Sequence, residues 1–549
     1  MPTREWVGLR RAGRYALLVA ATAANFAVLR APRHSVVSVL LVMAAGVLVA
    51  ALVVLEHRRR RLGLGAVAVA IAVTTVAAVW MPPRTSNDLW SYEMYGRMVT
   101  VHGASPYDHV PADFRSDPFA RRVSPRWMHR ASVYGPLFVG VATAGAWVAG
   151  PSPLSARLFF QAFAALALLL TLVVVWRTTR SLAALLFLGL NPVLVVIVVN
   201  GGHNDALIGL ALLVATLLAF RRRPRTAGAL IGLAALIKLT AGLALIGLVL
   251  WAWRHHLRRL AFTVAATCGL VLAVGYLPVL ANASHVLGDA DKTVTNGSPW
   301  NWIVDRLLRH DAWRNVPNPL APNTTLTAFF YVGLATVLLL GAILGWLAGR
   351  DRRPGPAVGV TLAAYPVAAE YAYPWYSAWC LPVFAANGLS ALGAVVWVQS
   401  VVLLAALKLP IGVQGSPLHA ALRVLLTDVA PPLLLLAFVV AALRQYPPSG
   451  WRRDGRAGPP ATRGPPRRSY SLGTRGTLTT LPPSSQPDAG AQQLELDPST
   501  VVDVRADDDP GQGLCNWLST TTWAILVTGS FTTWLGRAFG VPPGAASSR

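Results

Sequence analysis

Charged residues are scarce in this sequence. Of its 549 residues only 13% are Asp, Glu, Lys or Arg, whereas 54% are hydrophobic and the mean hydropathy is +0.50. Soluble domains usually carry about 25% charged residues. This deficit, together with many apolar runs long enough to cross a bilayer, excludes an ordinary soluble protein and predicts a polytopic membrane protein.

Acidic residues and lysine are scarce as well. The chain has 48 Lys+Arg against 23 Asp+Glu, a formal net charge of +25, and its three lysines are Lys238, Lys292 and Lys408. In a soluble protein this excess would indicate nucleic-acid binding. Here the arginines stand in short clusters between apolar runs, which the orientation of a membrane protein explains better. We therefore expect no nucleic-acid partner.

The sequence also lacks the patterns that hold metals or nucleotides. Its three cysteines, Cys268, Cys380 and Cys515, are far apart and form neither a disulfide framework nor a metal-ligand spacing. It has no P-loop, no HExxH motif and no dinucleotide fingerprint. We expect no metal and no cofactor, and a reaction that consumes neither ATP nor a nucleotide sugar on the inner side.

Apolar runs divide most of the chain into predicted membrane helices. Two of the runs, 226–253 and 376–408, are long enough to be helical hairpins. The runs lie near residues 13–31, 35–55, 62–81, 133–150, 155–176, 181–200, 203–220, 226–253, 259–281, 325–348, 355–371, 376–408 and 418–442.

Arginine clusters predict the side that each loop faces. The positive-inside rule places clusters such as 57–61, 221–225 and 254–259 in the cytoplasm, which leaves two large outer loops, about 82–132 and 282–324. The same sidedness puts the sequences GGHND and EYAYPWY at the outer ends of their helices.

The apolar run 133–150 does not fit this alternation as a spanning helix, because every later basic cluster would then change side. Its Gly and Pro content allows an interfacial or re-entrant segment. We predict about 12–14 transmembrane helices with both termini in the cytoplasm. Residues 1–445 form the membrane domain, and the Pro-, Gly- and Arg-rich residues 446–549 form a mostly disordered cytoplasmic tail.

The first outer loop begins with a candidate general base. Asn87 and Asp88 directly follow a predicted membrane helix, and a carboxylate at the membrane surface can deprotonate a hydroxyl group. Taken alone, Asp88 is explained more readily as a helix N-cap than as a catalytic residue. The tyrosines Tyr92 and Tyr107, and Tyr134 in the turn VYGP, suit an interfacial aromatic belt or a surface on which a sugar stacks.

The same loop contains the densest arginine cluster on the predicted outer side, within residues 115–130. Arg122 and Arg126 are candidates to hold a phosphate through the planar guanidinium group. Binding of anionic lipid head groups would explain the cluster as well.

A second polar group interrupts apolar sequence in NGGHNDALIGL. His203, Asn204 and Asp205 are predicted at the outer end of a helix, where a carboxylate near the N-terminus is favoured. That alone would explain Asp205. An ionisable residue at the end of a membrane helix is also a functional candidate, and the run of three beside two glycines favours a binding site.

Lys238, in LAALIKLTAGLAL, lies within an apolar hairpin, where an unpaired ammonium costs at least about 2.5–3.5 kcal/mol. It therefore needs an anionic partner, either a protein carboxylate or a lipid-linked phosphate. Farther along, EYAYPWYSAWCLP places Tyr373, Trp375 and Tyr376 at an outer membrane edge. They suit an aromatic belt or the wall of a site for a sugar or an isoprenoid.

Taken in order, NDLWSYEMYGR, GASPY, SVYGPL, LNPVLVV with GGHNDALIGL, IKLTAGL and YPWYSAWCLP resemble a known family. These motifs are similar to those of the actinobacterial polyprenyl-phosphate-mannose-dependent alpha-mannosyltransferases of the GT-C fold, which include the alpha-1,6 enzymes of lipomannan synthesis. The resemblance covers roughly residues 60–445. Ser105 departs from the pattern, because the family often has Asn before Pro-Tyr.

The resemblance implies a GT-C-like helical bundle and an inverting transfer at the outer face. Asp88 would deprotonate the acceptor hydroxyl group, and His203 and Lys238 would stabilise the phosphate that leaves. The implied partners are a polyprenyl-phosphate sugar donor, a glycolipid or mannan acceptor and membrane lipid. A transporter or flippase of lipid-linked sugars remains the alternative, although we find no internal repeat of the kind transporters show. The sequence determines neither the acceptor, nor the linkage, nor the oligomeric state.

Overall fold

The computed structural model of the chain describes residues 4–59, 62–279, 293–304, 322–410 and 416–448. Within these ranges the chain forms helices and contains no β-strand, which confirms the predicted all-α polytopic fold class. Most of the predicted second outer loop and the tail from residue 449 lie outside the described residues. The helices are α1 (Arg4–Arg30), α2 (Val36–Arg59), α3 (Leu64–Trp80), α4 (Asp88–Thr100), α5 (Pro125–Met128), α6 (Pro136–Ala149), α7 (Pro153–Thr179), α8 (Leu182–Gly189), α9 (Asp205–Phe220), α10 (Pro224–Ala235), α11 (Leu243–Arg254), α12 (Arg258–Tyr276), α15 (Pro322–Ala348), α16 (Gly355–Ala368), α17 (Ser377–Ala386), α18 (Ala391–Leu407), α19 (Pro417–Arg423) and α20 (Ala430–Gln445).

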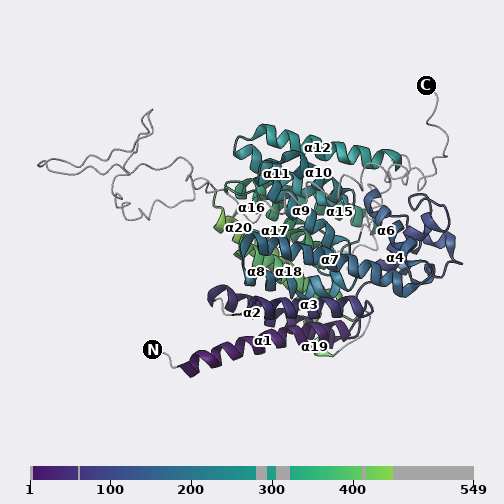
Figure 1. Cartoon of the computed structure of the whole chain (residues 1–549). Helices are drawn as coiled ribbons and strands as arrows, with labels where there is room; N and C mark the ends of the chain where they lie inside the picture. Colours follow the sequence, from purple (N-terminus) through teal and green to yellow (C-terminus); the bar gives the residue numbers. More distant parts are fainter. Residues whose placement is uncertain (1–3, 60–61, 280–292, 305–321, 411–415, 449–549) are drawn as a thin grey trace, which may run out of the picture.

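The apolar helices lie side by side in a bundle, with α1–α3 along one side and α12 along the other (Figure 1). Among the described residues, six helical segments are long and apolar enough to cross a membrane: Ala12–Arg30, Val36–Arg59, Pro153–Thr179, Arg258–Val279, Thr327–Ala348 and Pro417–Gln445. Shorter apolar helices are Leu64–Trp80, Pro136–Ala149, Asp205–Phe220, Leu239–Arg254, Gly355–Ala368 and Ala391–Leu407.

Contacts between loops show which helix ends lie together at each of the two ends of the bundle. At the end where α4 and α9 begin, Arg157 near the start of α7 donates a hydrogen bond to the Trp80 carbonyl at the end of α3 (2.9 Å). At the opposite end, Trp251 Nε1 donates to the Asp351 carbonyl (3.2 Å). We call these the site end and the arginine end, because the second carries the clusters 221–225 and 254–259.

Both runs that the sequence predicted as hairpins are divided into two helices. Run 226–253 becomes α10 and α11, and run 376–408 becomes α17 and α18. With 12 and 10 residues, α10 and α17 are about 18 and 15 Å long, shorter than the hydrophobic thickness of a bilayer. The joint between α10 and α11 therefore falls inside the apolar sequence, and Lys238 lies at this joint.

The run 181–200 is also broken, although the sequence predicted one helix. The Asn191 side chain accepts a hydrogen bond from the Val193 N–H (2.8 Å), so a new segment begins at Pro192 after α8 ends. The segment then winds as a π-helix over Leu194–Val199 and stops at Asn200. π-Helical turns are frequent at functional sites, and this one leads directly into the sequence GGHND.

Helix α6, which contains most of the run 133–150, packs against α4 at the site end of the bundle (Figure 1). The two backbones approach closely because Gly96 has no side chain, and a Cβ there would overlap the Ala142 carbonyl. The Gly135 N–H donates to the Ile237 carbonyl (3.0 Å), which attaches the start of α6 to the joint beside Lys238. That this run does not span the membrane remains a prediction.

An ion-pair network fixes the rest of the predicted first outer loop to α4. Arg97 Nε donates to both carboxylate oxygens of Asp117 (3.0 Å each), and His102 Nε2 lies 2.9 Å from Asp117 Oδ2. Burial raises the pKa of Asp117, but hydrogen bonds from Arg97, the Phe119 N–H and His102 outweigh it and lower the pKa below its usual value. The loop is therefore held rigidly over the site end at neutral pH.

The buried carboxyl group of Glu93 makes the stability of this region depend on pH. Glu93 lies on α4, is 0% exposed, and neither carboxylate oxygen has a hydrogen-bond partner. Burial raises its pKa from 4.5 to about 7, against the lowering effect of Arg97, and Asp117 adds to the rise. Because the pKa is higher in the folded state, the stabilising contribution is complete below about pH 4.5 and is lost as the pH rises through about 7.

We expect Glu93→Gln to remove this dependence. Thermal unfolding in detergent at pH 5 and pH 8 should show a larger fall in stability for the wild type than for the variant, by up to roughly 3 kcal/mol. Asp113→Asn is the matched control, since the Asp113 side chain is 47% exposed. An equal fall in the wild type and Glu93→Gln would contradict the assignment.

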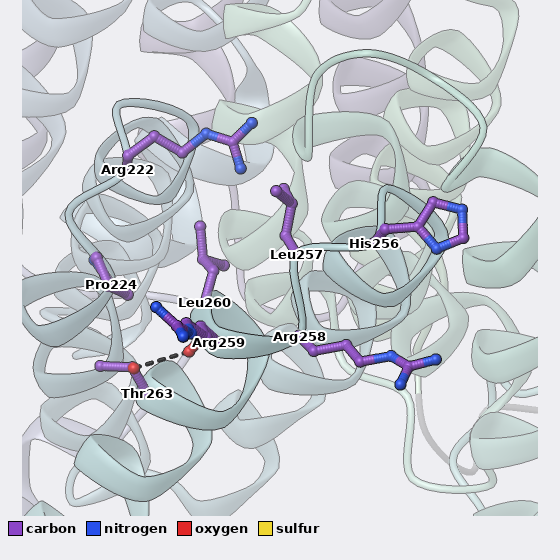
Figure 2. A pocket seen from close by; sticks show the side chains of 8 residues that line it. All are labelled: Arg222, Pro224, His256, Leu257, Arg258, Arg259, Leu260 and Thr263. Atoms are coloured by element: carbon purple, nitrogen blue, oxygen red, sulfur yellow. Dashed lines mark hydrogen bonds between the residues drawn. The ribbon is translucent and has the colours of Figure 1, made fainter.

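A basic pocket lies at the arginine end, between the α9–α10 and α11–α12 turns (Figure 2). Arg222 and His256 adopt left-handed backbone conformations there, with φ of 60° and 57°, which let the chain reverse between short helices. None of the residues that the sequence predicted for the site contributes to this pocket. Its lining residues are Arg222, Pro224, His256, Leu257, Arg258, Arg259, Leu260 and Thr263.

Candidate active site

Asp88 is the first residue of α4. Asn87 occupies the N-cap position, so the structure does not place Asp88 as the cap, and the Asp88 N–H donates to Ser86 Oγ (3.1 Å). The Asp88 side chain is 16% exposed. In the first turn of a helix a carboxylate is stabilised by the helix dipole, and this one keeps access to a ligand.

The GGHND sequence forms a tight turn between the π-helix and α9. Gly202 has φ of 67°, and a Cβ there would meet the Phe160 side chain at 2.9 Å. The His203 N–H donates to the Val198 carbonyl (2.9 Å), which closes the turn. His203 and Asn204 are therefore buried at the site end, and Asp205 is the first residue of α9.

Asp205 is the counter-ion of Lys238. Lys238 Nζ donates to both Asp205 oxygens, at 3.0 and 3.1 Å, and Trp379 Nε1 donates to Oδ1 at 2.8 Å. The Asp205 side chain is 0% exposed. Of the two partners that the sequence left open for Lys238, the protein carboxylate is the one the structure shows. With its oxygens held in this way, Asp205 is poorly placed to act as a base.

The Lys238 ammonium remains available to a ligand. Its side chain is 16% exposed at the joint between α10 and α11. Aromatic rings surround it, with Nζ 4.9 Å from the centre of Tyr376, 5.7 Å from that of Tyr134 and 5.8 Å from that of Trp379. Such rings attract a cation electrostatically without neutralising it, so the ammonium can still bind an anion.

His203 connects the two carboxylates. Its Nδ1 lies 4.0 Å from Asp88 Oδ2, 3.7 Å from Asp205 Oδ2 and 3.5 Å from the Tyr92 hydroxyl group. The ring stacks on Trp375, with centroids 4.4 Å apart. Nε2 is buried and has no hydrogen-bond partner, and the same holds for both side-chain polar atoms of Asn204. Buried polar atoms without partners are costly, so these atoms are candidates to contact a polar ligand.

The aromatic residues of YPWYSAWC line the same end. Tyr373 stacks on Trp375 with centroids 4.3 Å apart and the rings nearly parallel. Arg126 Nη1 donates to the Tyr373 hydroxyl group (2.8 Å), which links the first outer loop to this wall. The stack of Tyr373, Trp375 and His203, which we call the aromatic wall, presents flat rings of the kind on which sugars pack.

Not every predicted residue joins this group directly. Tyr134 donates to the Tyr92 hydroxyl group (3.4 Å), whereas Tyr107 is 1% exposed and donates to the Tyr134 carbonyl (2.9 Å). Arg122 is exposed, and its guanidinium lies 5.0 Å above the Trp90 ring. The substrate-lining role predicted for Tyr107 and the phosphate-binding role predicted for Arg122 remain predictions.

Gln161, which the sequence analysis missed, and Asn200, the first residue of NGGHNDALIGL, hold the Asp88 loop against the GGHND turn. Asn200 Nδ2 donates to the Met81 carbonyl (2.8 Å), and Gln161 Nε2 donates to the carbonyls of Met81 (3.0 Å) and Asn200 (2.6 Å). They satisfy carbonyl groups at the end of α3, which its own helix leaves free. The signal that could have indicated such a role is a glutamine inside the apolar run 155–176.

The predicted residues thus meet from four separate parts of the chain, but they do not form a metal site. Among the described residues, no three His, Cys, Asp or Glu side chains are grouped so that they could hold a metal ion. What the group offers instead is a partly exposed carboxylate, a partly exposed ammonium and an aromatic wall.

Comparison with known proteins gives a consistent result. Residues 12–255 match the family described as "Alpha-(1->6)-mannopyranosyltransferase, N-terminal domain". The Alpha-(1->6)-mannopyranosyltransferase A of Mycobacterium tuberculosis is 27% identical over 390 residues, which cover 64% of this chain and 72% of the relative. The protein of the same name from Corynebacterium glutamicum is 26% identical over 339 residues, which cover 55% and 67%. No solved structure matches the chain.

The matched segment contains Asp88, His203, Asp205 and Lys238, whereas the YPWYSAWC sequence lies beyond it. The resemblance inferred from the ordered motifs is confirmed by both the family match and the named relatives. By sequence, the chain is therefore similar to the alpha-(1->6)-mannopyranosyltransferases over the segment that contains most of the candidate site.

Proposed function

We propose that this membrane protein transfers a mannosyl residue from a polyprenyl-phosphate sugar to a glycolipid or mannan acceptor at the outer face of the membrane. The observation that carries the proposal is that one of the two carboxylates in the site has a lysine counter-ion and the other does not. Lys238 neutralises Asp205, while Asp88 stays partly exposed, with no lysine or arginine in contact with its carboxylate among the described residues. The Asp205 carboxylate therefore stabilises the site, and the Asp88 carboxylate is free to act as a base.

Asp88 would remove the proton from the attacking hydroxyl group of the acceptor. The acceptor oxygen would form a bond to the anomeric carbon as the bond from that carbon to the phosphate oxygen breaks. Attack from the face opposite the phosphate inverts the configuration, so an alpha product requires a beta-linked donor. General-base assistance of this kind contributes about 10²–10⁴-fold to a rate.

The bond electrons move to the phosphate, which leaves as polyprenyl phosphate. Lys238, 16% exposed, would hold the charge that develops on this group, and the unpartnered Nε2 of His203 could donate to it. Fixed cationic and N–H groups act strongly on developing charge where water is excluded. Arg126, which donates a hydrogen bond to Tyr373 of the aromatic wall, would contribute a further positive charge from the loop side.

The sugar would lie against the aromatic wall of Tyr373, Trp375 and His203. The buried Asn204 side chain, which has two polar atoms without partners, would then exchange hydrogen bonds with sugar hydroxyl groups. A polar group whose hydrogen bonds are completed only by the substrate discriminates against sugars that lack the matching hydroxyl.

The arginine end supports the proposed sidedness. The clusters 221–225 and 254–259, and Arg444 near the end of α20, lie at the end opposite Asp88. The positive-inside rule assigns that end to the cytoplasm and the site to the outer face. The same assignment places the segment after α20 in the cytoplasm and agrees with about 14 membrane crossings.

Sugar transfer by the purified protein tests the proposal. Wild type should move radiolabelled mannose from polyprenyl-phosphate mannose to a short alpha-mannoside, and the product linkage should be alpha-1,6 or alpha-1,2. A nucleotide sugar should not replace the lipid donor. Transfer from the nucleotide sugar alone would overturn the proposal, and so would a failure with every lipid-linked sugar offered.

A further inference from the structure

Lys408 is a buried cation without a partner. It follows the last residue of α18 at the site end, is 0% exposed, and its Nζ has no hydrogen-bond partner. Lys238, the other lysine among the described residues, has Asp205 as its counter-ion. A buried ammonium without a counter-ion is costly, so a lysine at this position calls for an explanation beyond packing.

Two arginines gather around Lys408. The Ser35 N–H donates to the Lys408 carbonyl (3.2 Å), which brings the α1–α2 loop, and with it Arg33, against the end of α18. Arg84, in the loop between α3 and α4, donates to the Arg30 carbonyl in the same place (2.6 Å). Arg33, Arg84 and Lys408 are the cation cluster. No carboxylate pairs with any of the three within the described residues.

The cation cluster adjoins the Asp88 loop. Arg33 Nη2 donates a hydrogen bond to the side chain of Asn87, the residue before Asp88. Both arginines are exposed and can contact a ligand directly, whereas the buried Lys408 ammonium adds its positive charge close to them. A ligand bound by the cation cluster would therefore lie close to the proposed catalytic carboxylate.

Membrane orientation does not explain these charges. The positive-inside rule accounts for the basic residues at the arginine end, but the cation cluster is at the site end, which the proposed sidedness assigns to the outer face. Three like charges grouped in this way repel one another and reduce stability unless an anion joins them. Guanidinium groups bind a phosphate through two parallel hydrogen bonds, and an ammonium adds a point charge.

We propose that Arg33, Arg84 and Lys408 form a second phosphate-binding subsite, which holds the phosphodiester of a lipid-linked substrate beside the Asp88 loop. This inference rests on the proposed function and adds a position for a substrate phosphate apart from Lys238. A phosphodiester is present both in the lipid-linked donor and in an acceptor built on a phosphoglycolipid. The experiment distinguishes these two sources.

Steady-state kinetics with two acceptors identifies the source. Wild type, Lys408→Met and Arg84→Gln are compared using a mannosylated phosphatidylinositol and a neutral alkyl mannoside, with Arg225→Gln at the arginine end as the control. A tenfold rise in KM for the phospholipid acceptor alone assigns the subsite to the acceptor. A similar rise in the donor KM with both acceptors assigns it to the donor. No change in any KM would overturn the proposal.

A binding measurement separates this inference from the proposed function. Thermal unfolding of the purified protein in detergent is followed with added phosphatidylinositol or with diacylglycerol, which has no phosphate. We expect phosphatidylinositol, but not diacylglycerol, to raise the unfolding temperature of the wild type. Without lipid, Lys408→Met should unfold at a higher temperature than the wild type. Added phosphatidylinositol should not raise the unfolding temperature of this variant further. If this pattern holds but no sugar is transferred, the subsite stands and the proposed function fails. Equal lipid effects on both proteins would overturn the subsite.

Discussion

Asp88→Asn should reduce kcat for mannosyl transfer by about 10³-fold and leave the donor KM within a few-fold of wild type. Asparagine has nearly the same shape and can keep the contact with His203, but it cannot accept a proton from the acceptor hydroxyl group. The change therefore removes the proton transfer while preserving the start of α4. Initial rates with polyprenyl-phosphate mannose and a short alpha-mannoside measure the effect.

Asp113→Asn is the control for this prediction, because Asp113 lies in the same outer loop and its side chain is 47% exposed. It should transfer mannose at the wild-type rate. Thermal unfolding checks that both variants are folded. A near-normal kcat in folded Asp88→Asn would show that the base is elsewhere. Asp205 would be a poor substitute, since Lys238 and Trp379 already occupy its oxygens.

The helices could be predicted closely from the sequence because a bilayer imposes strong constraints on composition and length. Runs 226–253 and 376–408 were too long for one span, and the structure divides both. The break at Asn191 was not predicted, because a single capping asparagine hardly changes the hydropathy of the run 181–200. The helix count and the sidedness remain predictions, as does the boundary at 445.

The sequence identified most residues of the candidate site, but not the contacts between them. Lys238 was known to need an anion, but its partner Asp205 lies 33 residues away. That pairing depends on α10 ending at Ala235, which hydropathy alone does not reveal. Trp379, in the same aromatic sequence, was given no role of its own, whereas its indole N–H donates to Asp205. Such contacts arise from how short helices pack, and no local pattern in the sequence specifies them.

Variants of the buried pair should separate structure from catalysis. Lys238→Met leaves the Asp205 carboxylate buried without its counter-ion, and breaking such a pair costs about 3–5 kcal/mol. Asp205→Asn should cost less, because Lys238 is 16% exposed and can reach water. In the double variant Asp205→Asn/Lys238→Met neither charge is left unpaired, so much of the stability lost in Lys238→Met should return. Thermal unfolding of the four proteins in detergent gives the coupling between the two residues.

In the double variant Asp205→Asn/Lys238→Met, mannosyl transfer should not recover even though thermal stability does. If Lys238 holds the phosphate as it leaves, the double variant lacks that cation and should remain about 10²-fold below wild type in kcat/KM for the lipid donor. Arg14 and Glu56 form a buried ion pair remote from the site, with Nη1 and Oε2 3.8 Å apart. The matched double variant Arg14→Met/Glu56→Gln should keep wild-type kinetics. Full recovery of transfer in the Asp205–Lys238 double variant would mean that the pair only supports the fold, and the donor phosphate would then need another cation in the site, for which Arg126 is the first candidate.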